Sequence, residues 1–258
     1  TPTPGPTSRP SAGPSVAPSQ TVAPSPTAGP SDAPPPTRLP SPTRPPFPAR
    51  LAGQDLTRIP TSQPVVALTF DAGANADAVT SILATLRREQ IRATFFLTGD
   101  FVQRYPATAA AIAAAGHRIA NHSRSHPHFP ALTGAGIAAQ VAGAEAAIRS
   151  ATGADAHPWF RFPFGDRDSR TIAAVNDLGY VPVRWTVDTL GWQGTGQGRT
   201  AAPVTERVLA SAQPGEIVLM HVGSNPGDGS TLDADALPAV IAGLRQRGYR
   251  FVTLDFML

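Results

Sequence analysis

The sequence predicts an α/β fold in which helices cover a sheet of parallel strands. From residue 65 onward, short runs of β-branched and aromatic residues alternate with alanine-rich stretches whose apolar residues recur at helical spacing. This alternation continues through residues 64–258, which is typical of strand–helix units stacked side by side. The pattern fits either a closed barrel or an open doubly wound sheet, and it does not choose between them.

The individual elements follow in chain order. The first strand is predicted over residues 65–70, an almost continuous apolar run, and the first helix over 76–90, where Val79, Ile82 and Leu86 share one face. Further strands are predicted over residues 93–97, 117–121, 159–164, 180–187, 217–220 and 250–254. Further helices are predicted over residues 107–115, 133–150, 169–178, 204–210 and 234–247.

Residues 1–50 differ sharply in composition from the rest. More than half of the 29 prolines of the chain fall there among Ser, Thr, Ala and Gly, and large apolar side chains are almost absent. Such a segment buries too little surface to offset the entropy of ordering it. We therefore predict a disordered Pro/Ser/Thr-rich tether over residues 1–50, a connecting segment over 51–63 and a folded domain over 64–258.

Composition and motifs exclude several classes of protein. The absence of cysteine removes disulfides, thiolate metal sites and cysteine nucleophiles. The net charge is +3, and all the Lys+Arg residues are arginines scattered along the chain, which gives little support to nucleic-acid binding. No glycine-rich phosphate loop follows the first strand, so nucleotide binding is disfavoured.

The expected location of the protein is outside the cell. No apolar run reaches the roughly 18 residues that a membrane span requires, so no transmembrane segment is expected. The chain starts without Met and runs straight into the Pro/Ser/Thr stretch, as exported proteins do after their signal segment is removed. We expect a secreted protein or one associated with the cell wall or cell surface.

Unusual polar residues lie at or near the ends of the predicted strands. They are Asp71, His122, His126, Arg161, Asp188 and His221. Both candidate architectures place their chemistry at the carboxyl ends of parallel strands, so these side chains should converge. Singly, each also fits a structural role, such as a helix N-terminal carboxylate, a core histidine or a buried ion pair. Their joint position favours a hydrolytic site.

The spacing of His122 and His126 points to a metal. On a helical turn, an H-x-x-x-H pair places two imidazoles on one side, where they can hold one divalent ion. A zincin peptidase would need Glu after the first histidine, but Ser123 stands there, and Pro127 argues against a continuing helix. A metallopeptidase is therefore disfavoured.

Five segments contain these residues, in this order: Thr69-Phe70-Asp71-Ala72-Gly73, His122-Ser123-Arg124-Ser125-His126-Pro127, Arg161-Phe162-Pro163-Phe164-Gly165, Asp188-Thr189-Leu190-Gly191-Trp192 and Leu219-Met220-His221. Together they resemble the polysaccharide deacetylases, carbohydrate esterase family four. The resemblance covers residues 64–258 and implies a distorted parallel (β/α) barrel. It also implies metal-assisted hydrolytic removal of acetyl groups from a cell-wall polysaccharide, such as the N-acetyl groups of peptidoglycan or a chitin-like glycan.

The resemblance assigns a role to each site residue. It implies Asp71 as general base, His221 as general acid, Arg161 as the group that orients Asp71, Asp188 as the group that tunes His221, and His122 and His126 as metal ligands. The expected ion is Zn²⁺, with Co²⁺ and Ni²⁺ as alternatives. The expected partner is an acetylated polysaccharide bound by a monomer.

One position departs from the family pattern. The family's first motif carries a second Asp as the third metal ligand, where this chain has Ala72. Either Asp77 or Asn75 replaces it, or water fills the place, or the site is inactive; family branches that act on muramic acid in peptidoglycan also depart here. Two other functions therefore stay open: an O-acetyl esterase of the acetylxylan type, and an inactive glycan-binding module.

Overall fold

The computed structural model describes residues 47–258, so the predicted tether over residues 1–50 lies almost entirely outside the described residues. The strands are β1 (Val65–Ala72), β2 (Thr94–Leu97), β3 (Arg118–Asn121), β4 (Trp159–Phe160), β5 (Val181–Pro182), β6 (Val187–Asp188), β7 (Glu216–His221) and β8 (Arg250–Phe251). The α-helices are α1 (Val79–Arg88), α2 (Gly99–Arg104), α3 (Pro106–Ala114), α4 (Gly134–Thr152), α5 (Ser169–Asp177), α6 (Ala201–Ser211) and α7 (Leu232–Gln246). None of the helices described is long and apolar enough to cross a membrane.

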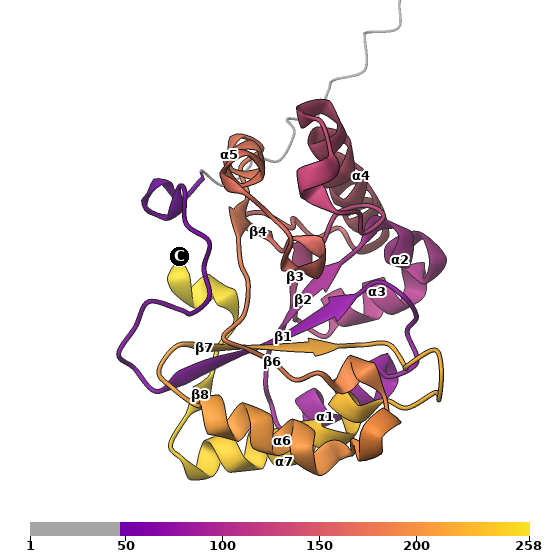
Figure 1. The fold of residues 1–258 in the computed structure, drawn as a ribbon, viewed down its shortest axis with the longest axis vertical. Coiled ribbons are helices and arrows are strands. Elements are labelled where there is room, and N and C mark those ends of the chain that lie inside the picture. The colour runs from indigo at the N-terminus through magenta and orange to yellow at the C-terminus, as the bar shows by residue number, and fades with distance from the viewer. Residues whose placement is uncertain (1–46) are drawn as a thin grey trace, which may run out of the picture. The chain divides into compact units, whose positions relative to one another are not determined.

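The strands form one parallel sheet that curls into a distorted barrel, as expected (Figure 1). Its order is β5-β4-β3-β2-β1-β7-β6, with β8 paired to the start of β1. The edge strands β5 and β6 do not pair with each other. The segment before β1 lies across this opening, because Leu56 bridges to Val183 beyond β5 and Arg58 bridges to Glu216 at the start of β7.

The single strand predicted over residues 180–187 is wrong, because the structure has two short strands there. β5 pairs with β4, whereas β6 pairs with β7 at the opposite edge of the sheet. Pro182 has no N–H to continue a ladder. Between the two strands, the Arg161 guanidinium donates to the carbonyl oxygens of Val183 at 3.1 Å and Arg184 at 2.8 Å. A side chain thus supplies hydrogen bonds that a neighbouring strand would otherwise supply.

Other predicted bounds shift for local reasons. The strand expected over residues 159–164 ends at Phe160, and a 3-10 turn follows at Pro163–Gly165. The helix α2 has no counterpart in the prediction. It begins after Thr98, whose side chain accepts a hydrogen bond from the backbone N–H of Phe101 and so caps the helix.

Side chains of β1 alternate between two apolar layers, as expected for a strand. Val66, Leu68 and Phe70 belong to the larger cluster, which contains the apolar faces of α1, α4 and α7. Ala67 belongs to a second cluster to which β1 to β5 and β7 each contribute. This second cluster fills the barrel interior. Asp71 shares the inward parity of Ala67 and lies at the carboxyl end of the barrel.

The segment predicted as a connector packs into the fold. Leu51, Leu56 and Ile59 are buried in the inner cluster together with Leu254 and Met257 from the C-terminal end. The two ends of the described chain therefore close the barrel interior at the amino ends of the strands.

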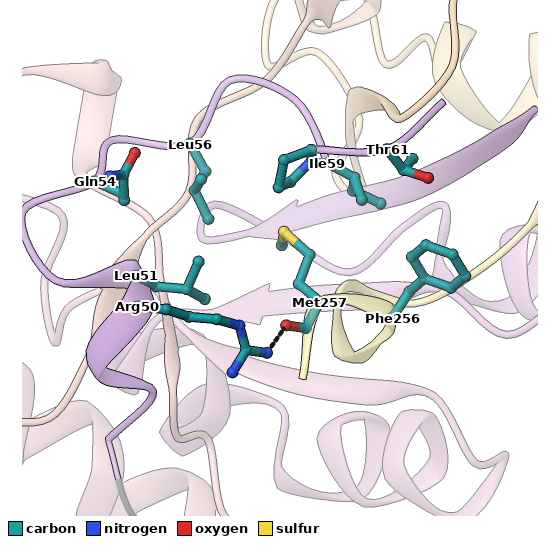
Figure 2. A pocket seen from close by; sticks show the side chains of 9 residues that line it. Arg50, Leu51, Gln54, Leu56, Ile59, Thr61, Phe256 and Met257 are labelled. Carbon is teal, nitrogen blue, oxygen red and sulfur yellow. Dashed lines mark hydrogen bonds between the residues drawn. The ribbon is translucent and has the colours of Figure 1, made fainter. Parts of the chain in front are cut away.

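A cavity of about 450 Å³ lies between these end segments, lined by residues from Arg50 to Thr61 and by Phe256 and Met257 (Figure 2). The Arg50 guanidinium donates to the carbonyl oxygen of Met257, and to that of Leu258 at 3.0 Å. No carboxylate or imidazole lines this cavity among the residues described. It therefore lacks acid–base chemistry and is not the candidate site.

Glu216 is a buried carboxyl at the start of β7, and among the residues described no cationic side chain lies within ion-pair distance of it. The Ser211 hydroxyl donates to one of its oxygens at 2.5 Å, and the other oxygen is without a hydrogen-bond partner in the described part of the chain. Burial raises the pKa of Glu216 to about 7, although the Ser211 hydroxyl and the charge of Arg247 oppose the rise. The fold therefore favours the neutral form of this side chain.

We expect Glu216→Gln to stabilise the protein at alkaline pH and to change little in acid. Stability from the neutral carboxyl is complete below its ordinary pKa of 4.5 and is lost as pH rises through about 7. The amide stays neutral throughout, so its advantage above neutral pH should be on the order of 1–3 kcal/mol. Urea unfolding at about pH 5 and about pH 8 measures this, with the exposed Glu206→Gln as control. A gain that does not grow with pH would contradict the expectation.

Candidate active site

A cavity of about 670 Å³ opens at the carboxyl ends of the strands. Five of the six site residues predicted from the sequence line it: Asp71, His122, His126, Asp188 and His221. The sixth, Arg161, is fully buried and binds Asp71. The structure thus brings all six residues to one place.

Asp71 is held ionised by a buried ion pair. Nη1 of Arg161 donates to Oδ1 of Asp71 at 2.7 Å, and the guanidinium lies over the ring of Phe96, 4.1 Å from its centre. Burial alone would raise the pKa of Asp71. The charge of Arg161 and the nearby imidazoles outweigh that effect and lower the pKa below its ordinary value. The carboxylate is therefore in its basic form at neutral pH, with Oδ2 free of Arg161.

The two histidines lie at the ends of a loop over residues 122–126, the histidine loop, rather than on a helical turn. Ser123 and His126 adopt positive φ angles of 67° and 60°, and the backbone N–H of His126 donates to the Ser123 hydroxyl at 3.1 Å. The ring centres of His122 and His126 are 4.8 Å apart. The predicted convergence is confirmed, while the helical geometry that suggested it is wrong.

Both imidazoles are neutral at neutral pH and suited to metal binding. Nδ1 of His122 lies 2.8 Å from the backbone oxygen of Arg161, which can only accept, so this nitrogen carries the proton. Nε2 of His122 is then an open lone pair, 3.4 Å from Oδ2 of Asp71. Burial lowers the pKa of His126 to about 4, and the neighbouring His122 adds to the effect.

Asn121 is a buried residue of the site that the sequence analysis missed. It ends β3 directly before His122. Its side-chain oxygen accepts from the backbone N–H of Ser123 at 2.9 Å, and its amide nitrogen donates to the Val141 carbonyl at 3.0 Å and to the Tyr180 hydroxyl at 3.3 Å. The amide thereby ties the start of the histidine loop to α4 and to the chain before β5.

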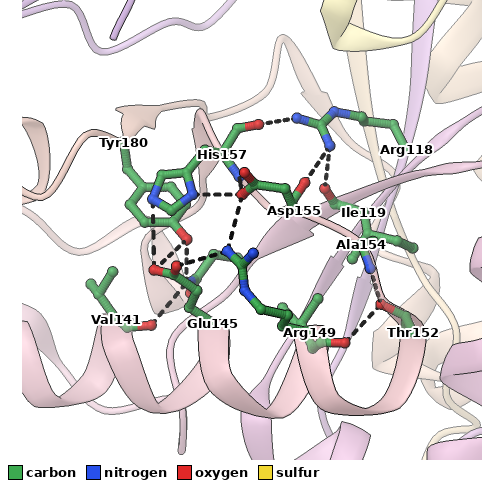
Figure 3. A network of polar contacts seen from close by, with 12 residues as sticks. Arg118, Ile119, Val141, Glu145, Arg149, Thr152, Ala154, Asp155, His157 and Tyr180 are labelled. Carbon is green, nitrogen blue, oxygen red and sulfur yellow. Dashed lines mark hydrogen bonds and ion pairs between the residues drawn. The ribbon is translucent and has the colours of Figure 1, made fainter. Parts of the chain in front are cut away.

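A polar network between α4 and the segment before β4 holds Tyr180 in place (Figure 3). The ring of His157 stacks on Tyr180 with 3.9 Å between ring centres, and its Nδ1 lies 2.6 Å from Oδ1 of Asp155. The Tyr180 hydroxyl also contacts Oε2 of Glu145 on α4 at 3.4 Å. This network supports the residue that orients Asn121, and through it the histidine loop.

His221 is positioned by Asp233, a second residue that the sequence analysis missed. Oδ2 of Asp233 accepts the backbone N–H of His221 at 2.8 Å and lies 3.6 Å from its Nδ1. Burial would lower the pKa of His221, but Asp233, Asp71 and, more weakly, Asp188 raise it above its ordinary value. Asp233 stands in the first turn of α7, so in the sequence it fits an ordinary helix N-terminal carboxylate.

Asp188 lines the cavity but contacts Trp192 rather than His221. Oδ1 of Asp188 accepts the backbone N–H of Leu190 at 2.9 Å, and Oδ2 lies 3.4 Å from Nε1 of Trp192. The Trp192 ring is 47% exposed and faces the ring of His221 edge-on at 6.3 Å. Asp188 therefore positions the Trp192 ring beside His221, and it raises the pKa of His221 only weakly, through its charge.

In the described part of the chain, no side chain takes the place of the missing carboxylate at Ala72. Ala72 is fully buried in the layer between sheet and helices. Oδ1 of Asn75 accepts the backbone N–H of Ser224 at 2.8 Å, and Oδ2 of Asp77 accepts the Ser224 hydroxyl at 2.5 Å. Both candidate ligands thus hold the loop after β7. Within residues 47–258, no group of three or more His, Cys, Asp or Glu side chains could hold a metal ion.

A parallel barrel with an ionised carboxylate, two neutral imidazoles and a raised-pKa histidine in one cavity defines a hydrolytic enzyme site. The model of the polysaccharide deacetylase family matches residues 58–183. A peptidoglycan-N-acetylglucosamine deacetylase of Bacillus cereus is 33% identical over 198 residues, covering 77% of this chain and 70% of the relative. A chitooligosaccharide deacetylase of Azorhizobium caulinodans is 30% identical over 200 residues, covering 74% and 93%. The chain belongs to the polysaccharide deacetylase family, whose members are hydrolases and are generally metal-dependent.

One similar solved structure is that of a pseudoenzyme. A family 4 carbohydrate esterase pseudoenzyme from Bacillus anthracis is 26% identical, with a TM-score of 0.72 over 80% of this chain and 69% of that one. A mutant of that pseudoenzyme, 27% identical to this chain, has restored enzymatic activity. The fold thus occurs in proteins with and without activity, so whether this chain is active depends on the residues of its site.

Proposed function

We propose that this protein hydrolyses acetyl groups from a cell-wall polysaccharide, with the N-acetyl groups of peptidoglycan or a chitin-like glycan as its substrates. The observation that carries the proposal is the placing of Asp71 and His221 on one cavity, each with its pKa shifted toward the role required. A general base must be deprotonated and a general acid protonated near the working pH. The named activities of the relatives support this substrate class.

The reaction then follows from the residues. Water attacks the acetyl carbon while Oδ2 of Asp71 takes its proton, and Arg161 keeps that carboxylate ionised and oriented. The C–N bond breaks as the imidazolium of His221 gives its proton to the departing nitrogen. Acetate and a free amine leave. Asp233 retains His221 in position and favours its protonated form before the transfer.

We propose that His122 and His126 hold a divalent metal, with Zn²⁺ first and Co²⁺ or Ni²⁺ as alternatives. Two neutral imidazoles in one cavity are suitable ligands for these ions. When bound, such an ion polarises the acetyl carbonyl and lowers the pKa of water. Catalytic zinc sites usually have three protein ligands, so with Ala72 in place we expect weaker binding, with water filling the remaining position.

We expect Ala72→Asp to tighten metal binding and to lower stability when metal is absent. A carboxylate introduced at this fully buried position lacks a cationic partner, which costs on the order of a few kcal/mol. A bound cation removes that cost, so thermal stability should respond to Zn²⁺ more strongly than in the wild type. Melting temperature and calorimetric titration with Zn²⁺ measure both effects, and Ala72→Asn separates shape from charge. Unchanged or weaker Zn²⁺ affinity would contradict this ligand position.

Two alternatives remain distinguishable by experiment. An O-acetyl esterase would use the same residues, because acid–base chemistry serves both amides and esters. An inactive glycan-binding module is favoured only by Ala72 and by the likeness to a pseudoenzyme, whereas the retained Asp71–Arg161 and His221–Asp233 pairs argue for catalysis. Acetate release from acetylated peptidoglycan, chitooligosaccharides and acetylxylan ranks the first two functions. No release from any of them, with glycan binding intact, would support the third.

We further propose that the protein acts outside the cell, as a monomer. Its proposed substrates lie in the cell wall, which supports export. Among the residues described, the exposed large apolar side chains are Phe164, Trp192, Phe256 and Leu258. The first two line the active-site cavity, and Phe256 lines the cavity at the opposite end. This leaves little apolar surface for a stable interface between copies.

A further inference from the structure

Arg104 is an exposed arginine at the end of α2 that lines the active-site cavity. Its Nη1 donates to the backbone oxygen of Ala74 at 3.2 Å, which fixes the guanidinium against the loop after β1. A guanidinium has five N–H donors, and this contact uses one of them. In the described part of the chain, no carboxylate lies within ion-pair distance of Arg104.

The carboxylates that line the same cavity are already engaged. Asp71 is bound by Arg161, and Asp100 lies 3.9 Å from Nε of Arg124. Asp188 accepts from the backbone N–H of Leu190 and contacts the indole of Trp192, at the far side of β1 and β7. Arg104 is the one arginine among the described lining residues, and within residues 47–258 its side chain makes no hydrogen bond besides the one to Ala74.

We propose that Arg104 makes the site selective for amino sugars that carry a carboxylate, such as muramic acid of peptidoglycan whose lactyl carboxylate is free. This inference rests on the proposed deacetylase function. A guanidinium pairs with a carboxylate through two parallel N–H···O bonds, which a neutral hydroxyl cannot reproduce. Chitin-like glycans offer hydroxyls and acetamides only. Arg104 therefore favours peptidoglycan over the neutral glycan among the two substrate classes left open above.

The test compares three oligosaccharides of equal length. The first contains muramic acid with a free carboxylate, the second is its methyl ester, and the third is a chitooligosaccharide. We expect wild-type kcat/KM to be about five- to tenfold higher on the acid than on the ester. Arg104→Gln should bring the two within about twofold, mainly through KM, and lower kcat/KM on the acid more than on the chitooligosaccharide. Arg104→Lys should restore part of the preference, because the ammonium carries the positive charge but cannot form two parallel hydrogen bonds with the carboxylate.

Arg87→Gln is the matched control, because it removes an exposed arginine from α1, away from the cavity. An acid-to-ester preference that survives in Arg104→Gln, or is lost equally in Arg87→Gln, would overturn the inference. Calorimetric binding of acid and ester to the same proteins gives a readout independent of turnover. If wild type binds the acid more tightly but releases no acetate, the deacetylase function fails and the role of Arg104 stands. If acetate is released without any acid preference, the deacetylase function stands and the role of Arg104 fails.

Discussion

Asp71→Asn is expected to lower kcat about 10²- to 10⁴-fold. The amide has nearly the same shape as the carboxylate and can still accept from Nη1 of Arg161, but it cannot take a proton from water. The substrate affinity should change far less than kcat, because Asp71 acts on the attacking water rather than on the sugar. Single-turnover acetate release, with circular dichroism to confirm folding, measures the effect.

Asp100→Asn provides the matched control for this prediction. Asp100 also lines the cavity, but it is exposed and pairs only with Arg124 at the rim. Its replacement should change kcat by no more than about threefold. Equal losses in the two variants, or an active Asp71→Asn protein, would show that the base has been assigned to the wrong residue.

Arg161→Gln is expected to destabilise the protein by about 3–5 kcal/mol. Arg161 is fully buried, and it joins Asp71 to the carbonyl oxygens of Val183 and Arg184 between β5 and β6. Its loss leaves a buried carboxylate without its partner and two carbonyls short of a donor. Burial of Asp71 is then opposed only by the nearby imidazoles, so its pKa should rise and the acid limb of the pH–rate profile should move to higher pH.

A double-mutant cycle separates these contributions. In the Asp71→Asn background Arg161 is a buried charge without its partner, and Arg161→Gln removes that charge, so the substitution should cost about 1–3 kcal/mol less than in the wild type. Urea unfolding of the four proteins gives the coupling energy. Strictly additive losses would mean that Arg161 only binds the carbonyls between β5 and β6 and does not stabilise the ionised form of Asp71.

Much of the barrel could be predicted from the sequence because its strands are buried on both faces. The run before Asp71 is apolar at nearly every position, and this pattern by itself places the carboxylate at a strand end. The prediction of a single strand over residues 180–187 is wrong because of a tertiary contact. Its two halves separate because Arg161, distant in the chain, binds the carbonyls between them.

The candidate site was predictable where a motif carries both residues and unpredictable where contact depends on packing. The spacing of His122 and His126 indicated a pair, although the turn between them uses positive φ angles that no helical pattern describes. Asp233 meets His221 only because α7 begins beside the end of β7. Asn121 supports the histidine loop through α4 and Tyr180, and neither contact leaves a local signal in the sequence.

The most direct test of the proposed function is acetate release from acetylated peptidoglycan, measured with and without chelator and with Zn²⁺ added back. We predict release that is lost on chelation, restored by Zn²⁺, and abolished in both Asp71→Asn and His221→Ala. This result would establish a metal-assisted deacetylase that works without a carboxylate at position 72. Release that persists in both variants, or no release at any Zn²⁺ level, would contradict it.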